Sequence, residues 1–391
     1  KEWQTKKLGE VCVVDKCQSV YKNLPYVGLE HIESQTGRFI GSTEPFVVKS
    51  STFKFSSEHV LYGRLRPYLN KVMLPDFKGH CSTEIFPFKP CPGLLRRFLQ
   101  YWFLRDETVK QIDATSTGAR MPRANMNAVL GFVFPLPPFP EQKRIVGILD
   151  EAFEGIAIAK ANAEKNLQNA HAIFESHLQF VFTQRGEGWV ENNLKSLTTK
   201  IGSGATPRGG EESYKSKGIS LIRSLNVHDL GFKYRKLAFL DDVQADELSN
   251  VEVQQHDVLL NITGASVARC CIVPMDILPA RVNQHVSIIR PIADKLEADF
   301  LHYLLISKFY KDQLLQTGAE GGSTRQAITK SQIQDFSIKY PATLREQRSI
   351  VADLDAMFAE TQRLESIYQQ KLAALEELKK SLLHQAFTGE L

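Results

Sequence analysis

Residues 141–183 read EQKRIVGILDEAFEGIAIAKANAEKNLQNAHAIFESHLQFVFT, and residues 346–388 read EQRSIVADLDAMFAETQRLESIYQQKLAALEELKKSLLHQAFT. The second stretch repeats the first without a gap, at a constant shift of 205 residues from 141 to 346. Self-similarity at one fixed offset is the signature of an internal repeat. Because the offset is too long for a solenoid repeat, the sequence predicts two copies of a unit that contains a domain and a helix.

Each stretch predicts one long helix with apolar positions in steps of four and three, which is the heptad spacing of a coiled-coil seam. About 40 residues at ~1.5 Å per residue give roughly 60 Å of helix. The alternative is two core helices of one large domain, but such helices usually span only about 8–20 residues. The predicted seam comprises Ile145, Leu149, Ala152, Ile156, Ala159 and Ala163 in the first helix, and Ile350, Leu354, Met357, Thr361, Leu364, Tyr368, Leu375, Leu378 and Leu382 in the second.

Two further regions, before each helix, echo one another more weakly. Trp3 corresponds to Trp189, Ser82-Thr83-Glu84-Ile85 to Asn283-Gln284-His285-Val286, and Phe98-Leu99-Gln100-Tyr101 to Phe300-Leu301-His302-Tyr303. The chain therefore divides into four parts. These are a first domain at 1–140, a first helix at 141–185, a second domain at 186–343 and a second helix at 344–391.

Short β-type runs between Gly- and Pro-rich turns predict an α+β fold with a mixed or antiparallel sheet in each domain. Val258–Ile262 and His285–Ile289 are the strand candidates. Phe98–Thr108 and Phe300–Leu315 are predicted as helices.

Composition and charge narrow the function class. The 391 residues are 43% hydrophobic and 24% charged, and no apolar run reaches the roughly 18 residues of a membrane helix. The opening Lys1-Glu2-Trp3 lacks a signal-peptide core, and the six cysteines form no Cys-x-x-Cys pair, so we expect a cytoplasmic protein without a membrane partner. Residues 1–140 carry 19 Lys+Arg against 12 Asp+Glu, whereas residues 186–343 carry 18 of each. The first domain could therefore face an anionic polymer, and any nucleic-acid surface of the second must be local.

Motifs for catalysis fail at the residue level. The loop Gly204–Gly210 lacks the Lys-Ser/Thr that closes a phosphate loop. Leu136-Pro137-Pro138-Phe139 is similar to an amino-methyltransferase motif, but Leu136 cannot accept a hydrogen bond from a target amine. The histidines form no metal-ligand pair, and His285 is interpreted as a strand residue. We therefore expect no catalytic residue, no metal site and no cofactor in this chain.

Markers along the whole chain carry a family resemblance. They are Pro137–Val146 and its partner Pro341–Val351, the ending Ser381–Leu391, the domain openings at Trp3 and Trp189, and Gly204-Ala205-Thr206-Pro207. With its two repeats, the chain resembles the specificity subunit of type I restriction–modification systems. The first domain departs from the pattern, with Gln18-Ser19-Val20-Tyr21 in place of the Gly-Ala-Thr-Pro run.

This resemblance implies two target-recognition domains, each reading half of a split, asymmetric site on double-stranded DNA. It also implies that the two helices pack as an antiparallel coiled coil between the domains, in an internal pseudo-twofold repeat. Two modification subunits would bring S-adenosylmethionine and methylate adenine. Restriction subunits would add ATP- and Mg²⁺-dependent translocation and cleavage. The alternative is a non-catalytic adaptor whose coiled coil spaces two protein-interaction modules.

Candidate DNA contacts follow from the side chains that meet base edges or phosphates, namely Arg, Lys, Asn, Gln and small polar residues. For each residue the alternative is a solvated surface group. In the first domain the candidates are Tyr62, Arg64, Arg66, Tyr68, Lys71, Arg120 and Arg123; in the second they are Arg208, Lys215, Asn261, Thr263, Arg269, Thr324, Arg325 and Gln326.

The glutamines at the two helix starts have another role. Glu141 and Glu346 suit the positive end of a helix dipole, which explains a carboxylate there. Gln142 and Gln347 gain nothing from the dipole, so we expect them to make a packing or partner contact.

Overall fold

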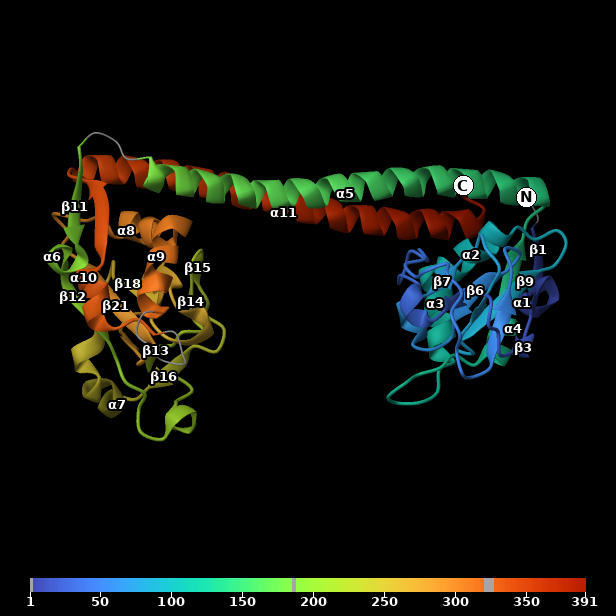
Figure 1. Ribbon diagram of the computed structural model, residues 1–391, viewed down its shortest axis with the longest axis horizontal. Helices are drawn as coiled ribbons and strands as arrows, with labels where there is room; N and C mark the ends of the chain where they lie inside the picture. The colour runs from blue at the N-terminus through green and yellow to red at the C-terminus, as the bar shows by residue number, and fades with distance from the viewer. Residues whose placement is uncertain (1–2, 185–187, 320–326) are drawn as a thin grey trace. The chain divides into compact units, whose positions relative to one another are not determined.

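A computed structural model describes residues 3–184, 188–319 and 327–391 of the chain (Figure 1). Its two longest elements are the repeated helices, α5 (Phe139–Thr183) and α11 (Leu344–Thr388). α5 begins two residues before the predicted start at 141, whereas α11 begins at the predicted position, 344. The hydroxyl of Thr343 accepts the backbone N–H of Glu346 at 3.3 Å, so it satisfies one of the free donors of the first turn. Within the described residues, no helix is long and apolar enough to cross a membrane.

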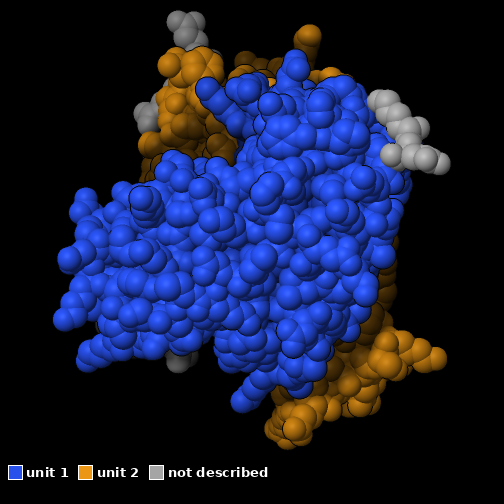
Figure 2. Space-filling model, turned by 90° about the vertical axis from the view of Figure 1, so that its right-hand side faces the viewer, with its two compact units in different colours: residues 1–165, 368–391 blue, residues 166–367 orange. Residues whose placement is uncertain are grey.

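The chain forms two compact units, Lys1–Lys165 with Tyr368–Leu391, and Asn166–Ile367 (Figure 2). Each unit thus contains one domain, the start of the helix that follows it and the end of the other helix. In the first unit Arg144 donates to the carbonyl of Leu391 at 2.7 Å, and Lys160 pairs with Glu376 at 2.7 Å. In the second unit His171 pairs with Glu365 at 2.9 Å. Rising numbers in α5 meet falling numbers in α11, so the helices are antiparallel within each unit, as expected.

The seam of the helix pair largely follows the heptad prediction. Ile145, Leu149 and Leu354 are at most 1% exposed, and Ile156, Ile350, Leu364, Leu375 and Leu382 are half-buried. The prediction for Leu378 is wrong, because its side chain is 47% exposed. The buried stripe instead steps by four from Leu375 to Lys379, which keeps it closer to the 3.6-residue period of a straight helix.

The first unit contains two four-stranded sheets below the helices (Figure 1). One sheet is antiparallel throughout; the other contains one parallel pair, β4 with β8. A separate two-stranded ribbon, β1 with β10, leads into α5. In order across each sheet, the strands are β2 (Cys12–Val14), β9 (Ile85–Pro90), β6 (Val60–Gly63) and β7 (Val72–Met73); then β3 (Gln18–Ser19), β5 (Thr52–Phe55), β8 (Gly79–Cys81) and β4 (Tyr26–Val27); and in the ribbon β1 (Gln4–Lys7) and β10 (Val133–Leu136).

The second unit repeats this plan. Its antiparallel sheet has the same order, its mixed sheet again has one parallel pair, β13 with β20, and the ribbon β11 with β22 leads into α11. The strands are β12 (Thr198–Ser203), β21 (Val286–Pro291), β18 (Val258–Asn261) and β19 (Cys270–Ile272); then β16 (Ala238–Leu240), β13 (Ile219–Ile222), β20 (Ala280–Val282) and β17 (Glu252–Val253); and in the ribbon β11 (Trp189–Asn193) and β22 (Ser337–Pro341). The α+β fold class is therefore confirmed, in two units of similar plan whose mixed sheets differ in the place of one edge strand, β3 beside β5 and β16 beside β13.

Each long helical run predicted in a domain is in fact two helices. The first is split into α2 (Arg96–Leu104) and α3 (Asp106–Ala114), and the second into α8 (Ala298–Ile306) and α9 (Lys308–Ala319). Arg105 and Ser307 interrupt them with extended backbone, at ψ 136° and 140°. The guanidinium of Arg105 lies 5.2 Å from the ring of Phe387, so the break contacts the end of α11.

A buried glutamine joins each domain to its helix. The Gln142 side chain is 0% exposed; it accepts from the N–H of Leu95 at 2.8 Å and donates to the carbonyls of Gly93 and Pro137, both at 2.9 Å. Gln347 makes the equivalent three bonds in the second unit. The expected packing contact is thus confirmed, and it explains why the repeat carries glutamine.

Tyrosine and aromatic contacts repeat in the same way. Tyr101 of α2 donates to Asp150, and Tyr303 of α8 donates to Asp355, so the first segment of each split helix is bonded to the long helix that follows its domain. The far end of the other helix completes the core, because Phe387 lies 4.6 Å from Phe98 and Phe182 lies 5.4 Å from Phe300, centroid to centroid.

The remaining helices are short. They are α1 (Leu8–Val11), α4 (Met126–Leu130), α6 (Leu194–Leu197), α7 (Asp242–Glu247) and α10 (Lys330–Asp335), and a two-stranded pair, β14 (Val227–His228) and β15 (Gly231–Phe232), joins the second unit.

Candidate nucleic-acid interface

Two loops of the first domain, predicted separately from sequence, meet at one carboxylate. Glu84 precedes β9, and its two oxygens each accept from an arginine Nε at 2.9 Å, one from Arg64 and one from Arg123. Backbone bonds hold the loops in place, since Arg66 donates to the carbonyl of Pro122 at 2.7 Å. The chain thus builds a small arginine-rich surface from residues almost 60 positions apart.

Exposed groups stand around this ion-pair cluster. Arg66 and Arg120 are exposed, and in the described part of the chain neither makes an ion pair. Tyr68 is 49% exposed beside them in sequence, and its ring is available for stacking. Arg66 has a left-handed backbone, φ 51°, in the tight turn that ends at Asn70. Arg66, Tyr68 and Arg120 are therefore free to meet a ligand, whereas Arg64 and Arg123 would first loosen from Glu84.

Two other candidates of this domain serve the fold in the structure. Tyr62 is 1% exposed and its ring is stacked on Phe103 at 4.7 Å, and burial raises the pKa of its phenol. Lys71 donates from Nζ to the carbonyls of Leu29 and Ile32 at 2.7 and 2.8 Å. Both groups make contacts within the fold, and the sequence pattern alone did not distinguish them from the arginines.

The second domain has a chain of hydrogen-bonded polar side chains at the corresponding place. Thr206 donates to Gln284, the Nε2 atoms of Gln284 and His285 are 3.2 Å apart, and His285 Nδ1 lies 2.6 Å from the hydroxyl of Thr263. Glycine at position 204 lets the loop that contains Thr206 lie close to the backbone of Val282. A Cβ at position 204 would lie only 1.8 Å from the carbonyl oxygen of Val282. These amide, hydroxyl and imidazole groups are donors and acceptors of the kind that read base edges.

The same backbone frame underlies both clusters. Arg64 donates its N–H to the carbonyl of Glu84 at 2.9 Å, and Ile262 donates to that of His285 at 3.0 Å. The carbonyls of Arg64 and Ile262 in turn accept from Ala124 and Ile328, at 2.9 and 2.8 Å. Glu84 and His285 therefore occupy equivalent positions, with different chemistry on one scaffold.

The other candidates of the second domain lie at varied depths. Asn261 is 0% exposed, and its side-chain amide donates to the carbonyl of Ser224 at 2.9 Å, so it stabilises the backbone at Ser224 from within the core. Arg208 is exposed, Lys215 pairs with Asp241 at 3.1 Å, and Arg269 is half-buried. Thr324, Arg325 and Gln326 lie outside the described residues.

Sequence reasoning missed Glu84, Gln284 and His285 as members of these clusters. The signal was present, because Ser82–Ile85 and Asn283–Val286 are corresponding stretches with different side chains. Their contacts with Arg123 and Thr263 cross 39 and 22 positions, and no local pattern reveals them.

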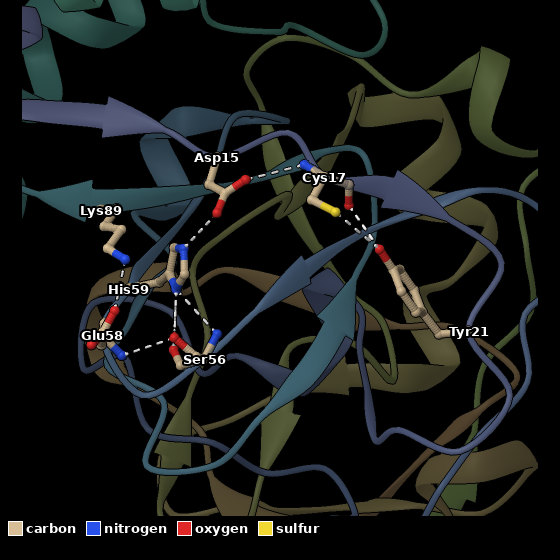
Figure 3. Close-up of polar contacts among 7 residues, drawn as sticks. All are labelled: Asp15, Cys17, Tyr21, Ser56, Glu58, His59 and Lys89. Carbon is tan, nitrogen blue, oxygen red and sulfur yellow. Dashed lines mark hydrogen bonds and ion pairs between the residues drawn. The ribbon is translucent and has the colours of Figure 1, made fainter.

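A Ser-His-Asp set in the first domain has a structural explanation (Figure 3). His59 Nδ1 lies 3.1 Å from both the N–H and the hydroxyl of Ser56, and Nε2 lies 3.4 Å from a carboxylate oxygen of Asp15. Because Nδ1 already accepts the Ser56 N–H, it is not free to take a proton from the hydroxyl. His59 is 4% exposed and locks the turn between β5 and β6. The described residues contain no cluster of three His, Cys, Asp or Glu side chains that could hold a metal ion.

Comparisons with known proteins agree with this architecture. The family described as "Type I restriction modification DNA specificity domain" matches residues 1–169 and 186–376. The chain is 28% identical over 214 residues to the type I restriction enzyme EcoDI specificity subunit of Escherichia coli, covering 50% of this chain and 47% of that protein. It is 24% identical over 311 residues to the EcoBI specificity subunit of Escherichia coli, covering 72% and 63%. The chain thus matches about half the length of the first of these relatives and less than two thirds of the second.

Solved structures share the fold. A chain from a study of complex assembly and conformational transition of the type I R-M system superposes with a TM-score of 0.81 at 24% identity, covering 100% of this chain and 98% of that one. The HsdS subunit from Thermoanaerobacter tengcongensis superposes with a TM-score of 0.65 at 22% identity, covering 100% and 97%.

Proposed function

Because the chain belongs to the type I restriction modification DNA specificity domain family, we propose that it is the subunit that selects the DNA target of such an enzyme. Each domain reads one half of a split, asymmetric site. The paired helices α5 and α11 hold the two domains and set the distance between the half-sites. The chain itself carries out no chemistry.

The observation that carries this proposal is the pair of equivalent clusters. One backbone frame presents Arg64, Arg123 and Glu84 in the first domain, and Thr263 and His285 in the second. Two domains with the same backbone frame and different polar side chains are suited to recognise two different DNA sequences. In the first domain we propose Arg66, Arg120 and Tyr68 as contacts, with Arg64 and Arg123 released from Glu84 on binding. In the second we propose Thr206, Gln284, Thr263 and Arg208.

The partners follow from the same proposal. Two modification subunits dock on the chain, hold S-adenosylmethionine and methylate adenine. Restriction subunits join them and supply the ATP- and Mg²⁺-dependent steps. This division of labour suits a chain in which Ser56 and His59 lock a turn.

The direct test is to express the chain with and without its modification subunits. With them, the host genome should carry adenine methylation at one bipartite sequence; the chain alone with S-adenosylmethionine should methylate nothing. The affinity of the complex for DNA should also fall linearly on a log–log plot against salt, because phosphate contacts release counterions. An adaptor with no DNA surface would show neither the motif nor the salt slope.

A further inference from the structure

The first unit contains a hollow of about 510 Å³ where the helix pair meets the first domain. Its apolar walls come from Tyr101 and Leu104 of the domain and from Phe153 and Ile156 of α5. Lys379 of α11 also lines it. The volume is within the roughly 300–1,000 Å³ of typical ligand pockets.

One positive charge in this hollow, that of Lys379, makes no ion pair in the described part of the chain. The Lys379 amine donates to the carbonyl of Gln35 at 3.3 Å and lies 5.5 Å from the centre of the Phe153 ring. The other cations are neutralised, since Lys160 pairs with Glu376 and Arg97 with Asp150, both at 2.7 Å. No carboxylate among the described residues lies within ion-pair distance of Lys379. Burial lowers the pKa of this amine, against the opposing effect of the Glu376 charge, and Glu376 is already paired with Lys160. The Lys379 amine is therefore partly desolvated and has no ion-pair partner of its own.

The second unit fills the corresponding space. Lys379 lies 205 positions after Phe174, and Phe153 lies 205 before Phe358. Phe174 is 3% exposed, and its ring is 5.2 Å from that of Phe358 and 6.5 Å from that of Tyr303, the counterpart of Tyr101. The hollow of the first unit thus arises where the repeat exchanges a phenyl ring for an amine. It is a feature of one unit and not of the repeated fold.

We propose that this hollow is a docking site for an acidic segment of one modification subunit. An apolar side chain of that segment enters between Tyr101 and Phe153, and a neighbouring carboxylate pairs with Lys379. Charge complementarity carries the choice of partner. A desolvated amine beside aromatic walls favours an anion with an apolar body, and a bound carboxylate restores the interaction that burial removed.

This inference rests on the proposed function, because it assumes that modification subunits bind the chain. It adds that the two of them bind differently. One contacts the hollow that Lys379 lines, and the other contacts a surface closed by Phe174.

Substitutions at Lys379 test the docking site in the full chain assembled with its modification subunits. Lys379→Met keeps the aliphatic stem and removes the charge, and Lys379→Glu reverses it. Lys379→Phe installs the residue of the second unit, which should fill the hollow and raise the melting temperature of the free chain. Lys371→Glu, exposed on the same helix, is the matched control for charge.

We expect the dissociation constant of one modification subunit to rise about tenfold or more for Lys379→Met, because a charge pair buried at an interface is lost. Lys379→Glu should weaken binding further, Lys379→Phe should weaken it while the chain becomes more stable, and Lys371→Glu should leave it within about twofold. Unchanged binding for both Lys379→Met and Lys379→Glu would overturn the docking site. A small carboxylate retained by the free chain in native mass spectrometry would also overturn it. If the wild-type chain binds no modification subunit, the proposed function fails instead.

Discussion

At the scale of single residues, Arg66 and Arg64 differ in whether an ion pair within the protein must break before the side chain binds DNA. Arg66 is exposed and without an ion pair in the described structure, while Arg64 is bonded to Glu84 at 2.9 Å. We expect Arg66→Ala to weaken DNA binding of the assembled complex by about 1–3 kcal/mol if the arginine meets a base, and to relax discrimination at one position.

A phosphate contact by Arg66 would behave differently. It would weaken all sequences alike and lower the salt slope by about one. The measurement is affinity against salt for cognate and mismatched duplexes, with Lys110→Ala, exposed on α3, as the control. Unchanged affinity in Arg66→Ala would remove this loop from the interface.

His302 gives the second unit a dependence on pH that the first unit lacks at this position, where the repeat has Gln100. Burial lowers the pKa of His302 from 6.5, against the opposing effect of its hydrogen bond to the carbonyl of Asp229 at 2.8 Å. A lowered folded-state pKa means that the unfolded chain binds the proton more readily. The stability of the unit should therefore be complete above pH 6.5 and fall as the pH drops towards the folded-state pKa.

His302→Gln should remove that loss. We expect the melting temperature of the variant to change less than that of the wild type between pH 7.5 and 5.5, as followed by calorimetry. An equal acid sensitivity in both proteins would show that another group controls the titration.

The sequence indicated the first-domain arginines and the buried glutamines by residue type and repeat position. It could not distinguish Arg66 from Tyr62, because β6 turns Tyr62 onto Phe103 while the next loop turns Arg66 outwards. Nor could it identify Asn261 as buried, since its bond to Ser224 spans 37 positions.

At the scale of elements, the helix pair depends on where its seam runs. Leu149 is 0% exposed at the seam, whereas Leu378, also predicted there, is 47% exposed. We expect Leu149→Ala to reduce the free energy of unfolding by about 2–5 kcal/mol, because it leaves a cavity in a packed core. Leu378→Ala should change it by less than about 0.5 kcal/mol, as for other surface positions. Chemical denaturation followed by helical circular dichroism would measure both, and similar losses would show that the seam passes through Leu378.

The two long helices and the strand candidates were predictable, because the spacing of their apolar residues is a local pattern. In the helices this pattern also occurs twice. The breaks at Arg105 and Ser307 were not predictable, because both residues interrupt runs whose apolar spacing continues. Packing explains the first break, as Arg105 stacks on Phe387 from the far end of the chain.

At the scale of the whole molecule, the proposal that the helices set the half-site distance has a geometric consequence. Seven residues inserted after Lys165 and seven after Gln370 would keep the heptad register and lengthen each helix by roughly 10 Å. The DNA rise of about 3.4 Å per base pair then predicts a spacer longer by about three base pairs. Those base pairs rotate the second half-site by nearly a third of a turn, so affinity should fall even for the best new spacer.

Methylation motifs in cells that express each insertion variant would measure the spacer. An active double insertion that keeps the original spacer would show that the helices do not set it. Lengthening one helix alone should disrupt pairing rather than change the spacing.

The central claim is that each domain reads its own half of the target, and exchange of one domain tests it most directly. Residues 186–343 would be replaced with the recognition domain of another such subunit, with both helices kept. The methylated motif of cells expressing the hybrid with its modification subunits would then be sequenced. The account predicts a motif in which one half-site is new, while the other half-site and the spacer are unchanged. A hybrid that methylates DNA with both half-sites altered, or with neither altered, would contradict it.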